Sequence, residues 1–360
     1  MLPFNNIKTM QKVIKSNNLN KDLSHILSQL AFDKLFILTD ENTEKLCYPL
    51  VKDNEQVTRA GKIIIKAGDN NKNIESLSSI WKYLSENGAT RHSLLINLGG
   101  GMLTDIGGFA AASFKRGIKC INIPTTLLGA VDAAVGGKTG INFNGLKNEI
   151  GAFAPAETVL IDSVFFRSLD HQNFLSGYAE MVKHGLIDSD KEWKATLSFD
   201  TEEIDYDKLK QLVVDSVAVK ERIVEVDPFE KGIRKALNLG HTIGHAFESL
   251  SYEVGRPVQH GYAVAWGIVC ELYLSQKYCG FPKDKLYKTV YFIKDNYEGF
   301  FFDCDHYEQL YEYMKHDKKN ESDTVNFTFL SDVGKIEINR TATKEDIFDS
   351  IDFLRESVGL

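Results

Sequence analysis

The first half of the chain alternates short apolar runs with segments of helical periodicity. Apolar runs predict strands over residues 34–39, 62–66, 92–98, 117–123 and 159–161, and residues 73–83 have the apolar spacing of a helix. Strands that alternate with helices predict a parallel sheet with right-handed crossovers. Ligands of such sheets bind beyond the carboxyl ends of the strands.

From residue 169 onwards the pattern becomes mostly helical. It predicts helices around Glu180 and over the following ranges: 206–226, 236–252, 262–278 and 283–294. Near the end, alternating residues in 325–330 and 335–338 flank a Gly-containing turn and predict a β-hairpin. We therefore expect two domains, an α/β domain over 1–165 and a helical domain with a hairpin over 166–360.

Composition narrows the class of protein. At 360 residues the chain can form two domains with cores of their own, and its net charge of −8 disfavours nucleic acid as a partner. We expect no membrane span, because no apolar run reaches roughly 18 residues. The five cysteines have no CxxC spacing and are interpreted as reduced core thiols of a cytoplasmic protein: Cys47, Cys120, Cys270, Cys279 and Cys304.

Histidine spacing indicates a metal site. His241, His245 and Glu248 fall on one face of a predicted helix. His260 follows, and Glu180 and His184 form a second i, i+4 pair upstream. Spacing alone leaves five candidate ligands in competition: Glu180, His184, His241, His245 and His260.

Two further stretches suit phosphate groups. Glycines at 99–101 lie between a predicted strand and a predicted helix, where backbone N–H groups can approach a pyrophosphate. A tight turn that packs helix against sheet would also explain them. Asp40, at the end of the first predicted strand, is either a ribose ligand or a helix N-cap.

The second stretch, residues 131–142, lacks periodicity and is interpreted as a glycine-rich loop. Lys138 lies within it and Lys147 follows. Lysines in such a loop suit a phosphate, although a solvated surface loop explains them equally well. The leading glycine of a P-loop is missing, which argues against an NTPase.

Taken together, these segments resemble the sugar phosphate cyclase family and, within it, the 3-dehydroquinate synthases. The residues that carry the resemblance occur in order and at the family spacing over most of the chain: 99–101 with Asp105, 116–118, 124–128, 132–142, 147–148, 179–180 with Lys183, 234–248, and 260–264.

The resemblance implies a Rossmann-like NAD-binding domain with a parallel sheet, an all-α metal-binding domain, a catalytic zinc (or cobalt) in the cleft between them, and a homodimer. It implies Glu180, His241 and His260 as metal ligands and assigns His245 to the substrate. Three protein ligands with an open position are typical of a catalytic zinc.

The resemblance also assigns residues to the other ligands. Those that face the phosphorylated sugar acid are Asp132, Lys138, Lys147, Asn148, Lys183, Lys220, Arg234, Asn238, His245 and Lys318, with Arg116 reaching across the dimer. Those that contact NAD⁺ are Asp40, Asn42, Asp69, Lys72, Gly100, Gly101, Met102, Leu103, Thr104, Asp105, Thr125, Thr126, Lys138 and Lys147. Four positions depart from the common family pattern: Asp69, Thr104, Ala134 and Tyr262.

The implied reaction converts 3-deoxy-D-arabino-heptulosonate 7-phosphate to 3-dehydroquinate and phosphate. Three alternatives remain: a cyclase for a sugar phosphate that lacks a carboxylate, a metal-dependent polyol dehydrogenase, and a binding protein without activity. Arg234 and Lys318 favour a carboxylated substrate, and the other predicted lysines favour a phosphate. Clustered metal ligands favour an enzyme.

Overall fold

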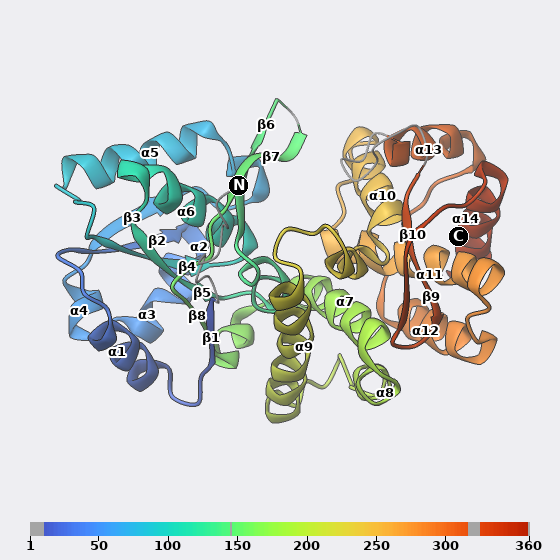
Figure 1. The fold of residues 1–360 in the computed structure, drawn as a ribbon, viewed down its shortest axis with the longest axis horizontal. Coiled ribbons are helices and arrows are strands. Elements are labelled where there is room, and N and C mark those ends of the chain that lie inside the picture. Colours follow the sequence, from blue (N-terminus) through green and yellow to red (C-terminus); the bar gives the residue numbers. More distant parts are fainter. Residues whose placement is uncertain (1–10, 145, 316–324, 359–360) are drawn as a thin grey trace, which may run out of the picture. The chain divides into compact units, whose positions relative to one another are not determined.

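The computed structural model describes residues 11–144, 146–315 and 325–358 (Figure 1). The chain forms two compact units, Met1–Leu169 and Asp170–Leu360, which we describe separately. Within the described residues, no helix is both long enough and apolar enough to cross a membrane.

Unit 1 is built on a six-stranded parallel sheet. Its strand order is β1-β8-β5-β4-β2-β3. The strands are β1 (Lys12–Lys15), β2 (Leu35–Asp40), β3 (Gly61–Ile65), β4 (Leu94–Gly99), β5 (Lys119–Pro124) and β8 (Thr158–Ile161). The parallel sheet and its five predicted strands are confirmed. The edge strand β1 was not predicted, because it has only four residues and a lysine at each end.

Helices connect the strands of unit 1. They are α1 (Leu19–Gln29), α2 (Glu41–Leu46), α3 (Tyr48–Val51), α4 (Glu55–Thr58), α5 (Ile74–Glu86) and α6 (Gly101–Ser113), with short helical turns η1 (Asp69–Asn71), η2 (Phe114–Arg116), η3 (Gly129–Ala133) and η4 (Ser163–Ser168). One core joins Leu38 and Leu95 of the sheet to Leu77 of α5 and Ile106 of α6, all four fully buried. This core fixes the start of α6 against the end of β4.

The sheet has a topological switch point between β2 and β4. From β2 the chain continues to β3 on one side, whereas from β4 it continues to β5 on the other. Asp40 ends β2 and Gly99 ends β4, and Leu38 pairs with Asn97, so the two strand ends are neighbours. Such a point is where open α/β sheets bind ligands.

The glycine-rich loop predicted over 131–142 is correct only in part: residues 134–137 form a turn after η3, but residues 138–142 belong to an antiparallel ribbon. Strands β6 (Lys138–Phe143) and β7 (Leu146–Phe153) pair with each other, and Ile141 is fully buried in the core of unit 1. Almost all of β7 is exposed, which explains why its sequence lacks the alternation of a half-buried strand.

Unit 2 is mostly helical. Its elements are α7 (His171–Asp188), α8 (Asp190–Leu197), α9 (Tyr206–Val226), η5 (Ile233–Asn238), α10 (His241–Glu253), α11 (His260–Cys279), α12 (Lys283–Asn296), η6 (Cys304–His306), α13 (Tyr307–Lys315) and α14 (Lys344–Val358), with a hairpin of β9 (Phe327–Asp332) and β10 (Lys335–Arg340). The hairpin is confirmed, and so are the predicted helices except for the one over 236–252.

One predicted helix has a different start. The periodicity suggested a single helix over 236–252, but α10 begins only at His241. Gly240 has a left-handed φ of 79°, which interrupts the helix and separates it from η5. Arg234 and Asn238 therefore lie on a separate short turn rather than on the face of α10.

The cysteines are less uniform than predicted. All five lie in the described part of the chain and are free thiols; Cys47, Cys120 and Cys270 are buried. Cys279 is half-buried and Cys304 is exposed, so the core-thiol interpretation is wrong for Cys304. Cys304 lies at the start of the surface turn η6 and accepts a hydrogen bond from Arg355 Nη1 (3.3 Å).

Helices α7 and α11 are in close backbone contact at a glycine. A Cβ atom on Gly261 would lie 1.9 Å from the backbone oxygen of Ser176. Gly261 N also donates to Ser176 Oγ (3.1 Å). Gly261 follows His260, and Ser176 precedes Glu180 by one helical turn, so this contact sets the spacing of two predicted metal ligands.

We predict that Gly261→Ala lowers the free energy of unfolding by about 3 kcal/mol, the upper end of the usual cost of overpacking. Urea denaturation followed by circular dichroism measures the loss. Gly255→Ala is the control, because its Cβ would meet no described atom within 4 Å. That control has only the left-handed backbone penalty, about 1 kcal/mol. Equal losses in the two variants would contradict the prediction.

Candidate functional site

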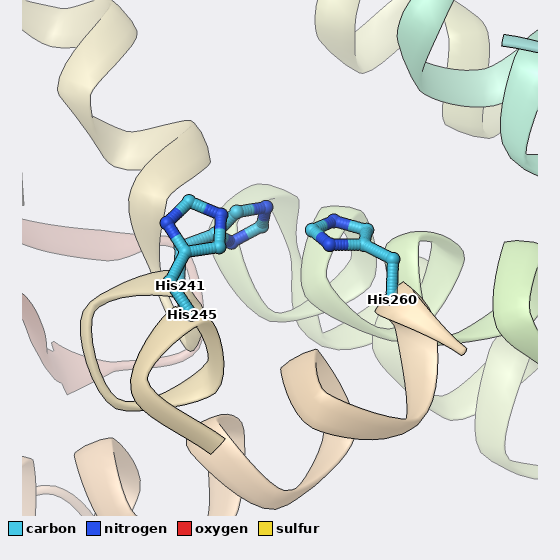
Figure 2. A group of neighbouring side chains, drawn as sticks. All are labelled: His241, His245 and His260. Carbon is cyan, nitrogen blue, oxygen red and sulfur yellow. The ribbon is translucent and has the colours of Figure 1, made fainter. Parts of the chain in front are cut away.

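Three helices of unit 2 bring Glu180, His241 and His260 together. Glu180 lies inside α7, and the two histidines are the first residues of α10 and α11. Glu180 Oε1 lies 3.3 Å from His241 Nε2 and 3.6 Å from His260 Nε2. Figure 2 shows the imidazoles of His241, His245 and His260 gathered around one space, with ring centroids 5.3–5.8 Å apart.

The spacing of these atoms suits a tetrahedral metal ion. Ligands bonded to zinc at about 2.0–2.1 Å are themselves about 3.3 Å apart. Glu180 is fully buried, and its carboxylate accepts no hydrogen bond of ordinary geometry from the described part of the chain. A buried carboxylate that faces two imidazole nitrogens is a donor set that fits zinc or cobalt.

Electrostatics keep Glu180 ionised. Burial alone would raise the pKa of Glu180, but the charges of Lys183 and His241 outweigh it and hold this pKa well below the usual value. Lys183 Nζ forms a close ion pair with Glu180 Oε2, and Lys183 itself is buried. The site therefore presents an anionic ligand where an ordinary core would hold a neutral side chain.

The second nitrogen of each predicted histidine ligand also has a hydrogen-bond partner. His241 Nδ1 lies 3.1 Å from the Leu239 carbonyl oxygen, and His260 Nδ1 lies 3.1 Å from Glu248 Oε2. Burial disfavours the imidazolium of His260, but Glu248 and Glu180 raise its pKa to about 10. Partners on Nδ1 leave Nε2 of each ring to face Glu180, the arrangement that second-shell groups give to metal ligands.

The remaining ligand candidates differ in position. The ligand atoms of His245, His241 and His260 lie within 4.8 Å of one another, so geometry leaves His245 beside the predicted ligands. His184 Nδ1 instead lies 2.7 Å from Ser216 Oγ on α9. Glu248 Oε2 contacts Nδ1 of His260, the ring nitrogen that does not face Glu180.

Arg234 and Asn238 bind the loop that precedes them. Arg234 Nη1 donates to the Pro228 carbonyl (2.6 Å), and Asn238 Nδ2 donates to Glu230 Oε1 (2.9 Å). Arg234 is almost fully buried, as is Lys220 on α9. Both cations therefore lie in the interior of unit 2, where charge-assisted contacts are strong.

In unit 1, several predicted residues converge on Lys72. Its buried ammonium group contacts Asp105 and Asn148, which belong to α6 and β7. Burial raises the pKa of Asp105, and the charge of Lys72 opposes that shift. Asp69 Oδ2 accepts from Asn142 Nδ2 (3.1 Å) and lies 3.6 Å from Lys147 Nζ. The structure thus joins predicted NAD⁺ and substrate residues in one cluster.

The glycine turn lies at the switch point of the sheet. Gly100 is the N-cap of α6 and has no side chain with which to cap the first N–H groups of this helix. The neighbouring turn after β5 contains Thr125, whose N–H donates to Gly99 O (3.0 Å), and Thr126, whose Oγ1 accepts from Gly129 N (3.0 Å). The helix start is a ready site for a pyrophosphate.

Asp40 serves as a helix N-cap. Its Oδ1 accepts from the backbone N–H of Asn42 (2.9 Å) and of Thr43 (2.8 Å), and Thr43 Oγ1 in turn accepts from Asp40 N (2.9 Å). This capping box fixes the start of α2 beside the switch point. The structural role of Asp40 is therefore shown, whereas a contact with ribose stays a prediction.

Three other predicted residues have distinct surroundings. Asp132 lies in η3, and Arg116 is exposed at the end of η2 with a left-handed φ of 69°. Lys318 lies outside the described residues.

The sequence-based predictions missed Glu271. Its buried carboxylate accepts from the N–H groups of Gly240 (2.6 Å), Thr242 (3.0 Å) and Ile243 (3.3 Å). Glu271 is the one charged residue within the apolar stretch 263–274. A lone charge in such a stretch indicates a buried and fully bonded group, and this signal could have identified it.

Comparisons with known proteins agree over most of the chain. The family model described as 3-dehydroquinate synthase N-terminal matches residues 62–176, and the one described as 3-dehydroquinate synthase C-terminal matches residues 177–320. The 3-dehydroquinate synthase of Parabacteroides distasonis is 59% identical over 350 residues, which cover 97% of this chain and 99% of that protein. The 3-dehydroquinate synthase of Clostridium tetani is 36% identical over 325 residues, 89% of this chain and 85% of that protein.

Solved structures show the same fold. The 2-epi-5-epi-valiolone synthase of Streptomyces hygroscopicus, with NAD⁺ and Zn²⁺ bound, matches with a TM-score of 0.84 at 21% identity and covers 97% of this chain and 98% of its own. A 2-deoxy-scyllo-inosose synthase complexed with carbaglucose-6-phosphate, NAD⁺ and Co²⁺ has a TM-score of 0.82 at 21% identity, with 96% of each chain covered. The two family models together match more than half of the chain, and the Parabacteroides relative is similar over nearly its full length. The chain therefore belongs to the 3-dehydroquinate synthase family.

Proposed function

We propose that this protein is a 3-dehydroquinate synthase, which converts 3-deoxy-D-arabino-heptulosonate 7-phosphate to 3-dehydroquinate and phosphate. This reaction is the second step of the shikimate pathway to aromatic amino acids. The observation that carries the proposal is the 59% identity to the Parabacteroides enzyme over 97% of this chain. The protein uses NAD⁺ as a catalyst together with zinc or cobalt.

Glu180, His241 and His260 are the proposed metal ligands, and His245 is assigned to the substrate. The 3.3 and 3.6 Å separations around Glu180 Oε1 support this choice, as does the buried carboxylate. When bound, the metal supplies Lewis-acid stabilisation of a substrate oxygen, and NAD⁺ takes up and returns a hydride. His245, next to the ligands, is positioned to move a proton.

Cationic side chains suit the two anionic groups of the substrate. Arg234 offers a planar fork for the carboxylate. The side chains proposed to bind the phosphate are those of Lys138, Lys147, Lys220 and His245. Other polar side chains proposed to contact the substrate are those of Asp132, Asn148, Lys183, Asn238 and Lys318. A phosphate dianion removed from water needs several such partners.

Unit 1 is proposed to bind NAD⁺ and unit 2 the metal. Support comes from the switch point beside Asp40 and from the N-terminus of α6, whose first turn contains Gly101 to Thr104. The remaining proposed NAD⁺ contacts are Asn42, Asp69, Lys72, Asp105, Thr125, Thr126, Lys138 and Lys147. We also propose a cytoplasmic homodimer in which Arg116 reaches the phosphate of the neighbouring subunit.

The first test is phosphate release by the purified protein with NAD⁺ and zinc. We expect turnover of 3-deoxy-D-arabino-heptulosonate 7-phosphate, and at least about thirtyfold less with sedoheptulose 7-phosphate or glucose 6-phosphate. Loss of a buried charge pair with the carboxylate costs roughly 2–5 kcal/mol, which accounts for that factor. If the protein preferred either of these sugar phosphates, which lack a carboxylate, the result would favour another cyclase activity. Steady NADH production from glycerol would instead favour a polyol dehydrogenase.

The second test separates His241 from His245. We expect His241→Ala to lose both bound metal and activity. His245→Ala should retain about one metal ion per chain, because three protein ligands suffice for a catalytic zinc. Its kcat should fall about 10²–10⁴-fold, the usual range for a lost proton-transfer group. Metal content by inductively coupled plasma spectrometry distinguishes the two, and a metal-free His245 variant would refute the ligand assignment.

The third test separates the capping role of Asp40 from a role in NAD⁺ binding. Asp40→Asn keeps a capping oxygen, so we expect its stability to stay within about 0.5 kcal/mol of the parent protein. If the carboxylate binds ribose hydroxyls, NAD⁺ affinity measured by calorimetry should fall about tenfold. Asp40→Ala should in addition lose about 1 kcal/mol of stability. Unchanged NAD⁺ affinity in Asp40→Asn would leave Asp40 with its capping role alone.

A further inference from the structure

Two buried carboxylates connect the helices that carry the histidine ligands. Glu271 lies on α11, yet all three of its hydrogen bonds given above come from the start of α10. Glu248 lies on α10, yet its carboxylate contacts His260 at the start of α11. Each helix therefore supplies a carboxylate to the N-terminal end of the other helix, where the proposed histidine ligand lies.

The contact from Glu271 leads directly to the orientation of His241. Gly240 has a left-handed φ of 79° and no side chain with which to cap α10. Glu271 supplies the missing cap, and its bond to Gly240 N (2.6 Å) holds the turn in place. The carbonyl of Leu239, in the same turn, accepts from His241 Nδ1 (3.1 Å) and thereby directs Nε2 toward Glu180.

A charged carboxylate is well suited to this task. Burial of an ion is costly unless donors compensate it. Three backbone N–H groups at the positive end of a helix provide that compensation. The turn is also sterically confined, because a Cβ on Gly240 would lie 2.5 Å from Ile268 Cγ1. Glu271 and Ile268 thus hold the same turn from α11.

We propose that Glu271 and Glu248 are positioning residues of the metal centre. Glu271 fixes the turn that orients His241, and Glu248 orients His260 through its Nδ1. Neither is a ligand, because their oxygens contact backbone N–H groups and the far imidazole nitrogen. The inference rests on the metal site of the proposed function and adds the residues that hold its two histidines in register.

The test uses the full-length protein with Glu271→Gln, which preserves shape but removes the charge and places an NH₂ group against backbone donors. We expect its affinity for Co²⁺, measured by titration against a chelator, to fall about 10–100-fold, as for other outer-shell partners of metal ligands. The visible absorption bands of bound Co²⁺ should change, because the ligand geometry changes. Amide hydrogen exchange at Thr242 and Ile243 should accelerate in the metal-free protein.

Ser275→Ala is the matched control. Ser275 lies one turn beyond Glu271 on the same helix, is equally buried, and accepts from Leu330 N (3.1 Å) on the β-hairpin. Its loss should lower stability while Co²⁺ affinity stays within about twofold of the parent and the spectrum is unchanged. The hydroxyl of Ser275 bonds to the hairpin and to the backbone carbonyl of Glu271 (2.6 Å), and it does not touch the Glu271 carboxylate that caps α10. If Glu271→Gln behaves like Ser275→Ala, Glu271 has only a structural role and the proposal is overturned.

Glu248→Gln tests whether Glu248 orients His260. This variant also tests the proposal if Glu271→Gln does not fold. It should weaken Co²⁺ binding by a similar factor, with normal exchange at Thr242 and Ile243. Unchanged Co²⁺ affinity in this variant would overturn the proposal. A parent protein that binds no Co²⁺ would refute the proposed function instead, so the two failures are distinguishable.

Discussion

The burial of one charged carboxylate constrains much of unit 2. Glu180 is completely inaccessible to solvent on α7, and an isolated buried carboxylate would be strongly unfavourable. Lys183, one turn along the same helix, supplies a full positive charge, and His241 and His260 contribute from two other helices. The positive charge and the two imidazoles thus offset the cost of burying this carboxylate, and they leave an anionic group at the proposed metal site.

The same constraint explains how closely the helices pack. Glu180 can meet both histidines only if α7, α10 and α11 approach within side-chain reach at these positions. Gly261 allows α11 to approach the backbone of α7 next to His260, and Gly240 allows α10 to turn sharply just before His241. Both histidines are first residues of their helices, so small changes at those helix ends would move their imidazoles directly.

The sequence predicts well those elements whose apolar residues recur with a regular period. The parallel sheet, the helices of unit 2 and the hairpin have strong periodicity, and the histidine spacing places His241 and His245 on α10. What the sequence does not predict depends on single residues in tertiary context. Gly240 splits a helix that has continuous periodicity, and Glu271 binds a turn 31 positions away along the chain. Spacing also could not separate the role of Glu248 from that of a ligand.

The antiparallel ribbon of β6 and β7 in unit 1 was not predicted from the sequence, and its presence changes how two proposed phosphate-binding lysines are held. Interpreted as a loop, residues 131–142 and the segment that follows would offer the mobile lysines Lys138 and Lys147 to a phosphate. As strands, β6 and β7 hold Lys138 and Lys147 on a paired backbone whose inner face is anchored by the buried Ile141. Lys72 then joins Asn148 of the ribbon to Asp105 of α6, so the ribbon and the glycine turn are fixed to each other. Because the backbone of these lysines is already fixed, only their exposed side chains lose conformational entropy when they bind an anion, and a preorganised backbone strengthens binding without any additional contact.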